Sequence, residues 1–395
     1  MNTPERFSNL PDYAFPRLRK LLHGTEPGGE VVDMTIGEPR HGMPGFVAPV
    51  VAQTVDEFAK YPPNEGTPEL KAAISGWISR RYGVSLDPET RVMALNGTRE
   101  GLFNACLALC PERAANGDTP TVLIPNPFYQ VYAVAAVAAG AEPVFVPATA
   151  ETGFLPDFAS LPEDVLARAE IAYLCSPSNP QGAVADALYW RELIGMAEGY
   201  GFRIFADECY SEVYRNAPPP GVLQVAAEMG ADPEKIVSFH SLSKRSNLPG
   251  LRSGFVASGP ANMAEIKRLR AYAGAPMPLP LQRVAELAWC DEAHVEESRA
   301  LYARKYAIAD EIFAAWPEYT PPQGGFFLWL KVDDSEQATL KLWRETGVKV
   351  LPGAYLGREV AGVNPGAGYI RVAMVTKDTD ELQDGLTRLR DCLAG

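Results

Sequence analysis

The sequence has few of the residues that cross-link small domains or bind metal ions. Its 395 residues include six cysteines and four histidines, and neither a C-x-x-C pair nor an H-E-x-x-H motif occurs. Scattered cysteines without a secretory leader are typical of reduced thiols and not of a disulfide scaffold or a zinc site. We therefore expect a metal-free protein of the cytoplasm.

Long apolar runs and an excess of positive charge are also lacking. The first residues, MNTPERFSNLPDYAF, have no apolar core of a signal peptide. The longest uncharged apolar run, Val131–Ala141, has 11 residues, whereas a membrane span needs about 20. The net charge of −13 makes the surface acidic, which disfavours nucleic acid and anionic membranes. We expect small-molecule substrates and neither a nucleic-acid nor a membrane partner.

What is present is the pattern of an α/β protein. Hydrophobic residues make up 47% and charged residues 22% of the chain, as in an ordinary globular protein. Thr67-Pro68 is a helix-start signal, and a second helix is expected from Thr98 to Pro111. Short apolar runs without polar alternation separate the helices and predict a mostly parallel sheet covered on both faces. These runs are Val92–Leu95, Thr121–Ile124, Pro143–Val146, Ile171–Leu174, Arg203–Ala206 and Ile236–Phe239.

The C-terminal third differs in its pattern. A long helical stretch is expected from Leu281 to Trp316, where Pro317 stops it, followed by strand-like segments GFFLWL and YIRVAMV around a helix near 336–345. We predict a large α/β domain at 47–280. A smaller α+β domain is expected from 281–395 together with the N-terminal segment 1–46.

Polar residues follow several of the buried strands, at the edge where open parallel sheets bind ligands. Ile236–Phe239 leads into His240-Ser241-Leu242-Ser243-Lys244, with Arg252 further on. A lysine placed there can form a Schiff base, with Ser241, Ser243 and Arg252 holding a phosphate nearby. Alone, the same pattern also fits a solvated turn lysine and a surface arginine.

Two neighbouring strand ends carry a carboxylate and an amide. Arg203–Ala206 leads into Asp207, with Tyr210 three residues on, and Ile171–Leu174 leads into a turn that contains Asn179. Asp207 either caps a turn or pairs with the protonated nitrogen of a heterocycle. Tyr210 and Asn179 are candidate donors to an oxygen on the same ring.

A phosphate site and a stacking aromatic complete the set. The turn Asn96-Gly97-Thr98-Arg99 precedes a helix, and helix N-termini favour bound phosphate. Tyr129 follows the strand Thr121–Ile124 and either stacks on a planar ring or packs in the core. Together these features describe pyridoxal 5′-phosphate, and the chain lacks the G-x-G-x-x-G and G-x-x-x-x-G-K-[ST] nucleotide motifs.

In this order the residues resemble the class I and II, or aspartate aminotransferase, family of fold type I pyridoxal-phosphate enzymes, over nearly the whole chain. The motifs are Ser241-x-Ser243-Lys244 with Arg252 and Gly254, Asp207-x-x-Tyr210, and Ser178-Asn179-Pro180-x-Gly182. The resemblance implies a pyridoxal-phosphate transaminase with a large α/β domain and a small domain. It also implies a homodimer with shared active sites.

Carried over residue by residue, the resemblance implies three sets of site residues. The catalytic set is Lys244, as Schiff-base lysine and proton shuttle, with Asp207 and Tyr210. The cofactor-binding set is Gly97, Thr98, Arg99, Tyr129, Asn179, Asp207, Tyr210, Ser241, Ser243, Lys244, Arg252 and, reaching the partner subunit's phosphate, Tyr61. The substrate-binding set is Gly37, Asn179 and Arg371, of which Arg371 binds the α-carboxylate of the substrate.

Within the family, four segments are most similar to the subfamily that acts on N-succinyl-LL-diaminopimelate in lysine biosynthesis. They are Thr35–His41, Asn96–Glu100, Asn126–Gln130 and His240–Gly250, with Thr98 replacing the usual serine and Gly101 the usual alanine. The resemblance implies exchange of an amino group between L-glutamate or 2-oxoglutarate and N-succinyl-2-amino-6-oxopimelate. A distal carboxylate needs a second cation, for which Arg17, Arg19, Arg40 and Arg270 are candidates.

Alternative functions remain open at this point. Aspartate or another amino acid is a possible substrate for the same class of transaminase. A pyridoxal-phosphate lyase or synthase would keep Lys244 and Asp207 in place. A cofactor-sensing regulatory module would need a basic DNA-binding extension, which the net charge does not favour.

Overall fold

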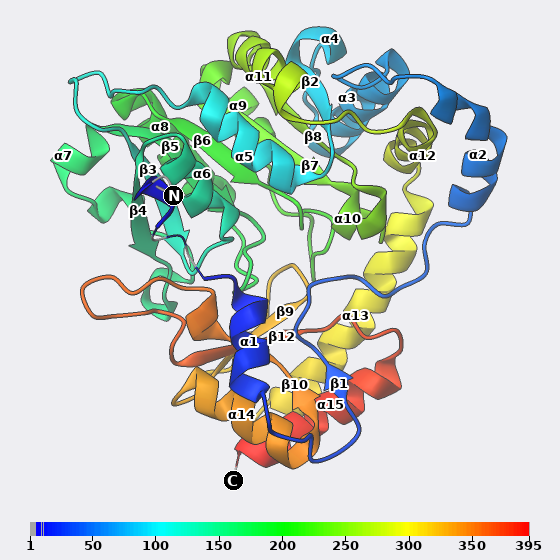
Figure 1. Cartoon of the computed structure of the whole chain (residues 1–395), viewed down its shortest axis with the longest axis vertical. Helices are drawn as coiled ribbons and strands as arrows, with labels where there is room; N and C mark the ends of the chain where they lie inside the picture. The colour runs from blue at the N-terminus through cyan, green and yellow to red at the C-terminus, as the bar shows by residue number, and fades with distance from the viewer. Residues whose placement is uncertain (1–4, 9, 11, 395) are drawn as a thin grey trace.

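The computed structural model describes residues 5–8, 10 and 12–394, which form two layered units (Figure 1). The upper unit in the figure is built on a seven-stranded sheet, and the lower unit holds a three-stranded and a two-stranded sheet. Among the described residues, no helix combines the length and apolar character needed to cross a membrane.

The seven-stranded sheet is mostly parallel, as the apolar runs predicted. Its strand order is β2-β8-β7-β6-β5-β3-β4, and only β8 runs against its neighbours. All six predicted strands are present, and β8 is additional. The strands are β2 (Val92–Leu95), β3 (Thr121–Asn126), β4 (Glu142–Pro147), β5 (Ala169–Cys175), β6 (Arg203–Asp207), β7 (Ile236–Ser241) and β8 (Gly254–Ser258).

Helices cover both faces of this sheet, which explains why its strands lack polar alternation. Along β5, Ile171 and Tyr173 belong to one apolar cluster and Ala172 and Leu174 to the other. One face is covered by α3 (Pro68–Tyr82), α8 (Ala187–Tyr200), α9 (Val222–Met229) and α12 (Leu279–Cys290), and the other by α5 (Thr98–Leu109), α6 (Val131–Ala138) and α11 (Pro260–Ala273). Short helices are α2 (Val47–Gln53), α4 (Pro88–Arg91), α7 (Glu163–Leu166) and α10 (Leu242–Arg245).

The start of α3 follows the capping signal in the sequence. Thr67 accepts a hydrogen bond from the Leu70 N–H, and Pro68 occupies the first helical position. Gly83 ends the helix with φ +70°, a left-handed conformation that costs glycine little.

The lower unit combines segments from both ends of the chain. The N-terminal β1 pairs in parallel with β10, and in Figure 1 α1 lies beside α14. The three-stranded antiparallel sheet has the order β11-β12-β9. The elements are α1 (Ala14–Leu22), β1 (Val32–Asp33), α13 (Ala293–Phe313), β9 (Phe327–Lys331), α14 (Ser335–Thr346), β10 (Val348–Lys349), β11 (Leu351–Pro352), β12 (Tyr369–Ala373) and α15 (Thr379–Leu393).

The single helical stretch expected from Leu281 to Trp316 is wrong, because the chain breaks between α12 and α13. Asp291 is extended, and its carboxylate accepts a hydrogen bond at 3.1 Å from the N–H of His294, which lies in the first turn of the new helix. Arg245 also donates to the Asp291 carbonyl at 3.2 Å. Consequently α12 packs against α2 and α3, whereas α13 packs against α15. The division of the chain into domains at 46/47 and 280/281 stays a prediction.

Candidate active site

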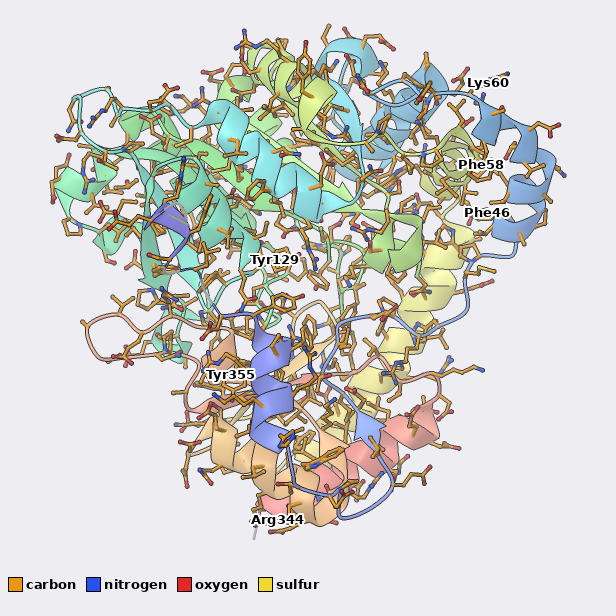
Figure 2. All side chains as sticks on the ribbon, in the orientation of Figure 1. Phe46, Phe58, Lys60, Tyr129, Arg344 and Tyr355 are labelled. Carbon is orange, nitrogen blue, oxygen red and sulfur yellow. The ribbon has the colours of Figure 1, made fainter. Side chains whose placement is uncertain are left out.

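A cavity lies where the two units meet, and its walls come from both. In Figure 2, Tyr129 marks the lower margin of the upper unit and Tyr355 lies below it. All of the predicted site residues except Gly97 and Tyr61 line this cavity. The lining residues that the sequence analysis predicted are Gly37, Thr98, Arg99, Tyr129, Asn179, Asp207, Tyr210, Ser241, Ser243, Lys244, Arg252 and Arg371.

Lys244 lies in the short helix α10, directly after β7. Its Nζ donates to the Gly37 carbonyl and lies 6.0 Å from the centre of the Tyr210 ring and 5.4 Å from that of Phe326. Burial lowers the pKa of Lys244 to about 8 because charge is disfavoured away from water. The neutral, nucleophilic fraction of the amine at neutral pH is therefore larger than for an ordinary lysine.

Asp207 ends β6 and is buried at the floor of the cavity. Its Oδ2 accepts a hydrogen bond from the Tyr132 hydroxyl at 2.7 Å, and its Oδ1 accepts a weaker one from the Cys209 N–H at 3.4 Å. Burial raises the pKa of Asp207, and these hydrogen bonds partly oppose the effect. Within the described residues no cation pairs with this carboxylate, so a cationic group in the cavity would stabilise its charged form.

Arg371 enters the cavity from β12 and is held by two hydrogen bonds. Its Nη1 donates to the Asn179 Oδ1 at 2.9 Å and its Nη2 to the Thr35 carbonyl at 2.7 Å. Its Nε is buried and has no partner among the described residues. Burial lowers the pKa of Arg371 to about 10, so the group remains charged at neutral pH. No carboxylate among the described residues forms an ion pair with it.

Gly37 lies in the same part of the cavity and has no room for a side chain. A Cβ added there would come within 2.5 Å of the Phe327 ring. The guanidinium carbon of Arg371 lies 4.3 Å from the centre of that ring. Glycine at position 37 thus lets the backbone approach the residues around Arg371.

The turn before α5 forms the opposite end of the cavity. Gly97 has φ +80° and caps α5 without a side-chain hydrogen bond, which leaves the first N–H groups of a 12-residue helix available to an anion. A Cβ on Gly97 would collide with the Arg252 guanidinium. Arg252 donates to the Pro249 carbonyl at 2.8 Å and to the Asn96 carbonyl at 3.3 Å. Hydroxyl groups of Thr98, Ser241 and Ser243 line the same cavity.

Tyr129 and Arg99 lie together on the cavity wall. The Arg99 Nε donates to the Tyr129 hydroxyl at 2.6 Å. That hydrogen bond raises the pKa of Arg99, whereas burial raises the pKa of Tyr129. Both side chains are therefore held in one arrangement, with the arginine charged and the phenol neutral.

Tyr61 is not brought to this cavity within one chain. Its side chain is fully exposed, on the segment that follows α2. Tyr61 therefore lies at the surface and does not contact the cavity of its own chain.

None of the four arginines predicted to bind a distal carboxylate is among the described residues that line the cavity. Arg17 lies over the Tyr355 ring, 3.8 Å from its centre, and Arg19 is exposed. Arg40 donates to the Asp33 carbonyl at 3.4 Å. Arg270 is buried in an ion pair with Glu100, and it also donates to the Gly274 carbonyl at 3.1 Å. These four arginines are already occupied or lie outside the site.

Sequence reasoning missed Tyr132, the hydrogen-bond partner of Asp207. Tyr132 lies three residues after Tyr129, and its side chain is fully buried. It carries the only side-chain polar group in the run Val131–Ala141. A buried phenol almost always finds a hydrogen-bond partner, so this single hydroxyl was the available signal.

Comparisons with known proteins agree with this geometry. The family model of aminotransferase class I and II matches residues 29–389. An LL-diaminopimelate aminotransferase of Moorella thermoacetica is 32% identical over 405 residues, covering 100% of this chain and 99% of the relative. The crystal structure of an aminotransferase from Neisseria meningitidis has a TM-score of 0.94 and 36% identity, covering 99% of this chain and 100% of the other.

A further solved structure, a probable N-succinyldiaminopimelate aminotransferase from Thermus thermophilus, has a TM-score of 0.84 at 25% identity, covering 96% of this chain and 99% of the other. The fold and the site thus define a pyridoxal-phosphate enzyme of fold type I. This chain belongs to the class I and II aminotransferase family.

Class I and II aminotransferases depend on pyridoxal 5′-phosphate, and the residues of this cavity fit that cofactor. The uncapped N-terminus of α5 and the space left by Gly97 suit a phosphate. Asp207 has no cationic partner in the part of the chain that the structure describes, and Lys244 has a lowered pKa. Among the described residues, no group of three or more His, Cys, Asp or Glu side chains is placed to hold a metal ion.

Proposed function

We propose that this aminotransferase exchanges an amino group between L-glutamate or 2-oxoglutarate and N-succinyl-2-amino-6-oxopimelate of lysine biosynthesis. The observation that carries the proposal is the meeting of Lys244, the buried Asp207 and several guanidinium groups in one cavity. Those cations concentrate positive charge locally in a chain whose net charge is −13. Such a site suits acidic substrates.

The proposed cofactor ligands follow from their positions around the cavity. Lys244 would hold the aldehyde, Asp207 the ring nitrogen, Asn179 and Tyr210 the ring oxygen, and Tyr129 the ring face. Asn179 uses its Oδ1 to accept from Arg371, which leaves its Nδ2 as the donor to the ring oxygen. The phosphate would be bound by Gly97, Thr98, Arg99, Ser241, Ser243 and Arg252.

When bound, pyridoxal phosphate supplies the electron sink for the electrons of the substrate Cα–H bond. Asp207 would stabilise the protonated, positively charged form of the ring nitrogen, because a carboxylate and an adjacent cation stabilise each other. The Lys244 Nζ would accept the proton from the substrate Cα and donate it to the cofactor carbon that carries the aldehyde. The lowered pKa of Lys244 favours this role, since the amine must be neutral to accept a proton.

Arg371 orients the substrate in this proposal. Its planar guanidinium can bind the α-carboxylate through two parallel hydrogen bonds, which lysine cannot reproduce. The hydrogen bonds to Asn179 and Thr35 fix the guanidinium before substrate arrives. Fixing the carboxylate determines which bond at Cα is broken, and Gly37 leaves space beside it.

The proposed assembly is a homodimer in which Tyr61 reaches the phosphate of the partner subunit. Val55, Phe58 and Tyr61 are 54%, 52% and 101% exposed, so three large apolar side chains face outward within seven residues. Exposed apolar patches of this kind mark interaction surfaces, and twofold dimers are the commonest homo-oligomers.

A cytoplasmic location stays a prediction.

A second candidate acceptor is the oxo acid that corresponds to LL-diaminopimelate itself. The names of the Moorella thermoacetica and Aquifex aeolicus relatives, each 32% identical, favour it. The two candidates differ at the distal end of the substrate, which carries a succinyl carboxylate in one case and a free amino group in the other. Amino-acid substrates such as aspartate and lyase chemistry on the same fold are the remaining alternatives.

A half-reaction screen tests the proposal. The visible absorbance of the holoenzyme is titrated with L-glutamate, N-succinyl-LL-diaminopimelate, LL-diaminopimelate and L-aspartate in turn. We expect conversion to the pyridoxamine form with glutamate and with the succinylated amine, and release of 2-oxoglutarate from glutamate. Efficient conversion with LL-diaminopimelate and none with its succinyl derivative would favour the second candidate. Release of ammonia with no pyridoxamine form would contradict transamination.

A further inference from the structure

A carboxylate lies in the first turn of the helix whose N-terminus is proposed to bind the cofactor phosphate. Glu100 is the third residue of α5, and its Oε2 accepts a hydrogen bond at 3.2 Å from the N–H of Asn96, in the turn before the helix. A negative charge in the first turn stabilises a helix, because the N-terminus carries a partial positive charge. The same charge opposes the binding of a second anion there, so a phosphate and an uncompensated Glu100 carboxylate would repel each other.

Arg270 neutralises this carboxylate from the last turn of α11. Its Nε forms an ion pair with the Glu100 Oε1, and the arginine side chain is 1% exposed. Its two terminal nitrogens donate to the carbonyls of Gly274 and Ala275 at 3.1 and 3.3 Å. Removing one partner of such a buried pair leaves the other charge without compensation. The charge at the start of α5 therefore depends on a residue of α11.

The turn before α5 is held by several contacts around this pair. Besides its N–H, Asn96 uses its carbonyl, which accepts from Arg252 at 3.3 Å, and its side-chain amide, which donates to the Ala275 carbonyl. The Asn104 Nδ2 donates to the Glu100 Oε1 at 2.9 Å and fixes the carboxylate in turn. These contacts hold the turn in the conformation that leaves the first N–H groups of α5 available to an anion.

We infer that Glu100 and Arg270 form a positioning pair for the phosphate of the cofactor. Glu100 holds the turn that presents the N–H groups, and Arg270 cancels the negative charge that Glu100 brings to this end of the cavity. Neither residue is among the described residues that line the cavity, so both act through the turn and through the local electric field. The inference rests on the phosphate site of the proposed function.

The test separates the phosphate from the rest of the cofactor. Dissociation constants of pyridoxal phosphate and of pyridoxal, which lacks the phosphate, are measured by absorbance titration of the apoprotein. Arg270→Met leaves the Glu100 charge uncompensated, so the constant for pyridoxal phosphate should rise roughly 5- to 30-fold, the range for a partly buried charge at a helix terminus. The constant for pyridoxal should change by less than about 3-fold, since its alcohol carries no charge to be repelled.

Glu100→Gln removes the charge and keeps an oxygen that can accept from the Asn96 N–H. The dissociation constant of pyridoxal phosphate should fall or stay equal to that of wild type, because Arg270 then adds positive charge near the phosphate. The double variant Glu100→Gln/Arg270→Met should lie within about 3-fold of wild type, since neither charge remains. A purely structural pair would instead weaken the binding of both ligands in either single variant. Glu100→Gln retains the buried arginine and so tests the charge independently of any folding defect in Arg270→Met.

Arg168→Met is the matched control, because Arg168 forms an ion pair with Glu142 at 2.9 Å and does not line the cavity. It should leave both dissociation constants unchanged. Three results would overturn the role of the pair: no selective loss of pyridoxal phosphate in Arg270→Met, weaker binding of it in Glu100→Gln, or no recovery in the double variant. If wild type binds pyridoxal as tightly as pyridoxal phosphate, the proposed phosphate site itself fails, so the two failures are distinguishable.

Discussion

Replacing Tyr132 with phenylalanine removes the hydroxyl that donates to Asp207 while preserving the ring. The hydroxyl lies 2.7 Å from the Asp207 Oδ2, and both side chains are buried. A hydrogen bond to a charged group contributes about 1.5–3 kcal/mol. Because the hydroxyl stabilises the charged carboxylate, losing it should raise the pKa of Asp207 further.

The stability effect should depend on pH with a definite sign. Burial raises the pKa of Asp207 in the folded protein, so Asp207 contributes stability that is present at low pH and lost as pH rises through its folded pKa. Tyr132→Phe makes that loss larger. The free energy of unfolding of the variant apoprotein should therefore be about 1.5–3 kcal/mol below wild type at pH 8. The difference should shrink as the pH falls through the pKa of Asp207.

Tyr173→Phe is the matched control for this experiment. Tyr173 stacks on Tyr132 with ring centres 4.4 Å apart, and its hydroxyl donates to the Leu102 carbonyl at 2.8 Å, an uncharged acceptor. Its loss should cost about 1 kcal/mol at every pH. Urea unfolding of the two apoprotein variants, followed by tryptophan fluorescence from pH 5 to 8, measures both effects. A Tyr132→Phe deficit that is independent of pH would refute the coupling to Asp207.

Two further predictions concern the cavity amine and the substrate carboxylate. The rate at which apoprotein combines with pyridoxal phosphate should rise with pH to a midpoint near 8, because the pKa of Lys244 is lowered to about 8. Stopped-flow absorbance checks this, and a midpoint near the ordinary lysine value of 10.5 would contradict the burial effect. Arg371→Lys should raise the KM for every amino acid by roughly 10- to 150-fold, since the planar fork is lost. Steady-state kinetics with glutamate and alanine should show similar increases, and an effect on glutamate alone would assign Arg371 to the distal carboxylate.

Much of the fold was predictable from the sequence because burial on both faces leaves a simple pattern. The run at Ile171–Leu174 is apolar throughout, and the structure places its alternate residues in opposite clusters. In the run at Ile236–Phe239, Ile236 belongs to one cluster and Val237 and Phe239 to the other. Asp207 and Lys244 lie at the ends of adjacent parallel strands, β6 and β7, so chain order alone brings them to one edge. The family and the pyridoxal-phosphate dependence are confirmed, and the individual roles of the site residues stay predictions.

What the sequence did not reveal depends on contacts between distant segments. Nothing near Arg270 in the sequence indicates that Glu100 neutralises it, and nothing near Arg99 indicates that Tyr129 holds it in the cavity. The break after α12 depends partly on Arg245, which donates to the Asp291 carbonyl from 46 residues away. Periodicity describes neighbours along one element and carries no information about such pairings.

The account depends most on Lys244 as the residue that binds the cofactor covalently. Reduction of the holoenzyme with borohydride, followed by proteolysis and mass spectrometry, fixes the cofactor to its lysine and identifies the peptide. We predict one pyridoxyl group per chain, on Lys244. Labelling of a different lysine, such as the buried Lys305 or Lys71, or no labelling at all, would contradict the assignment.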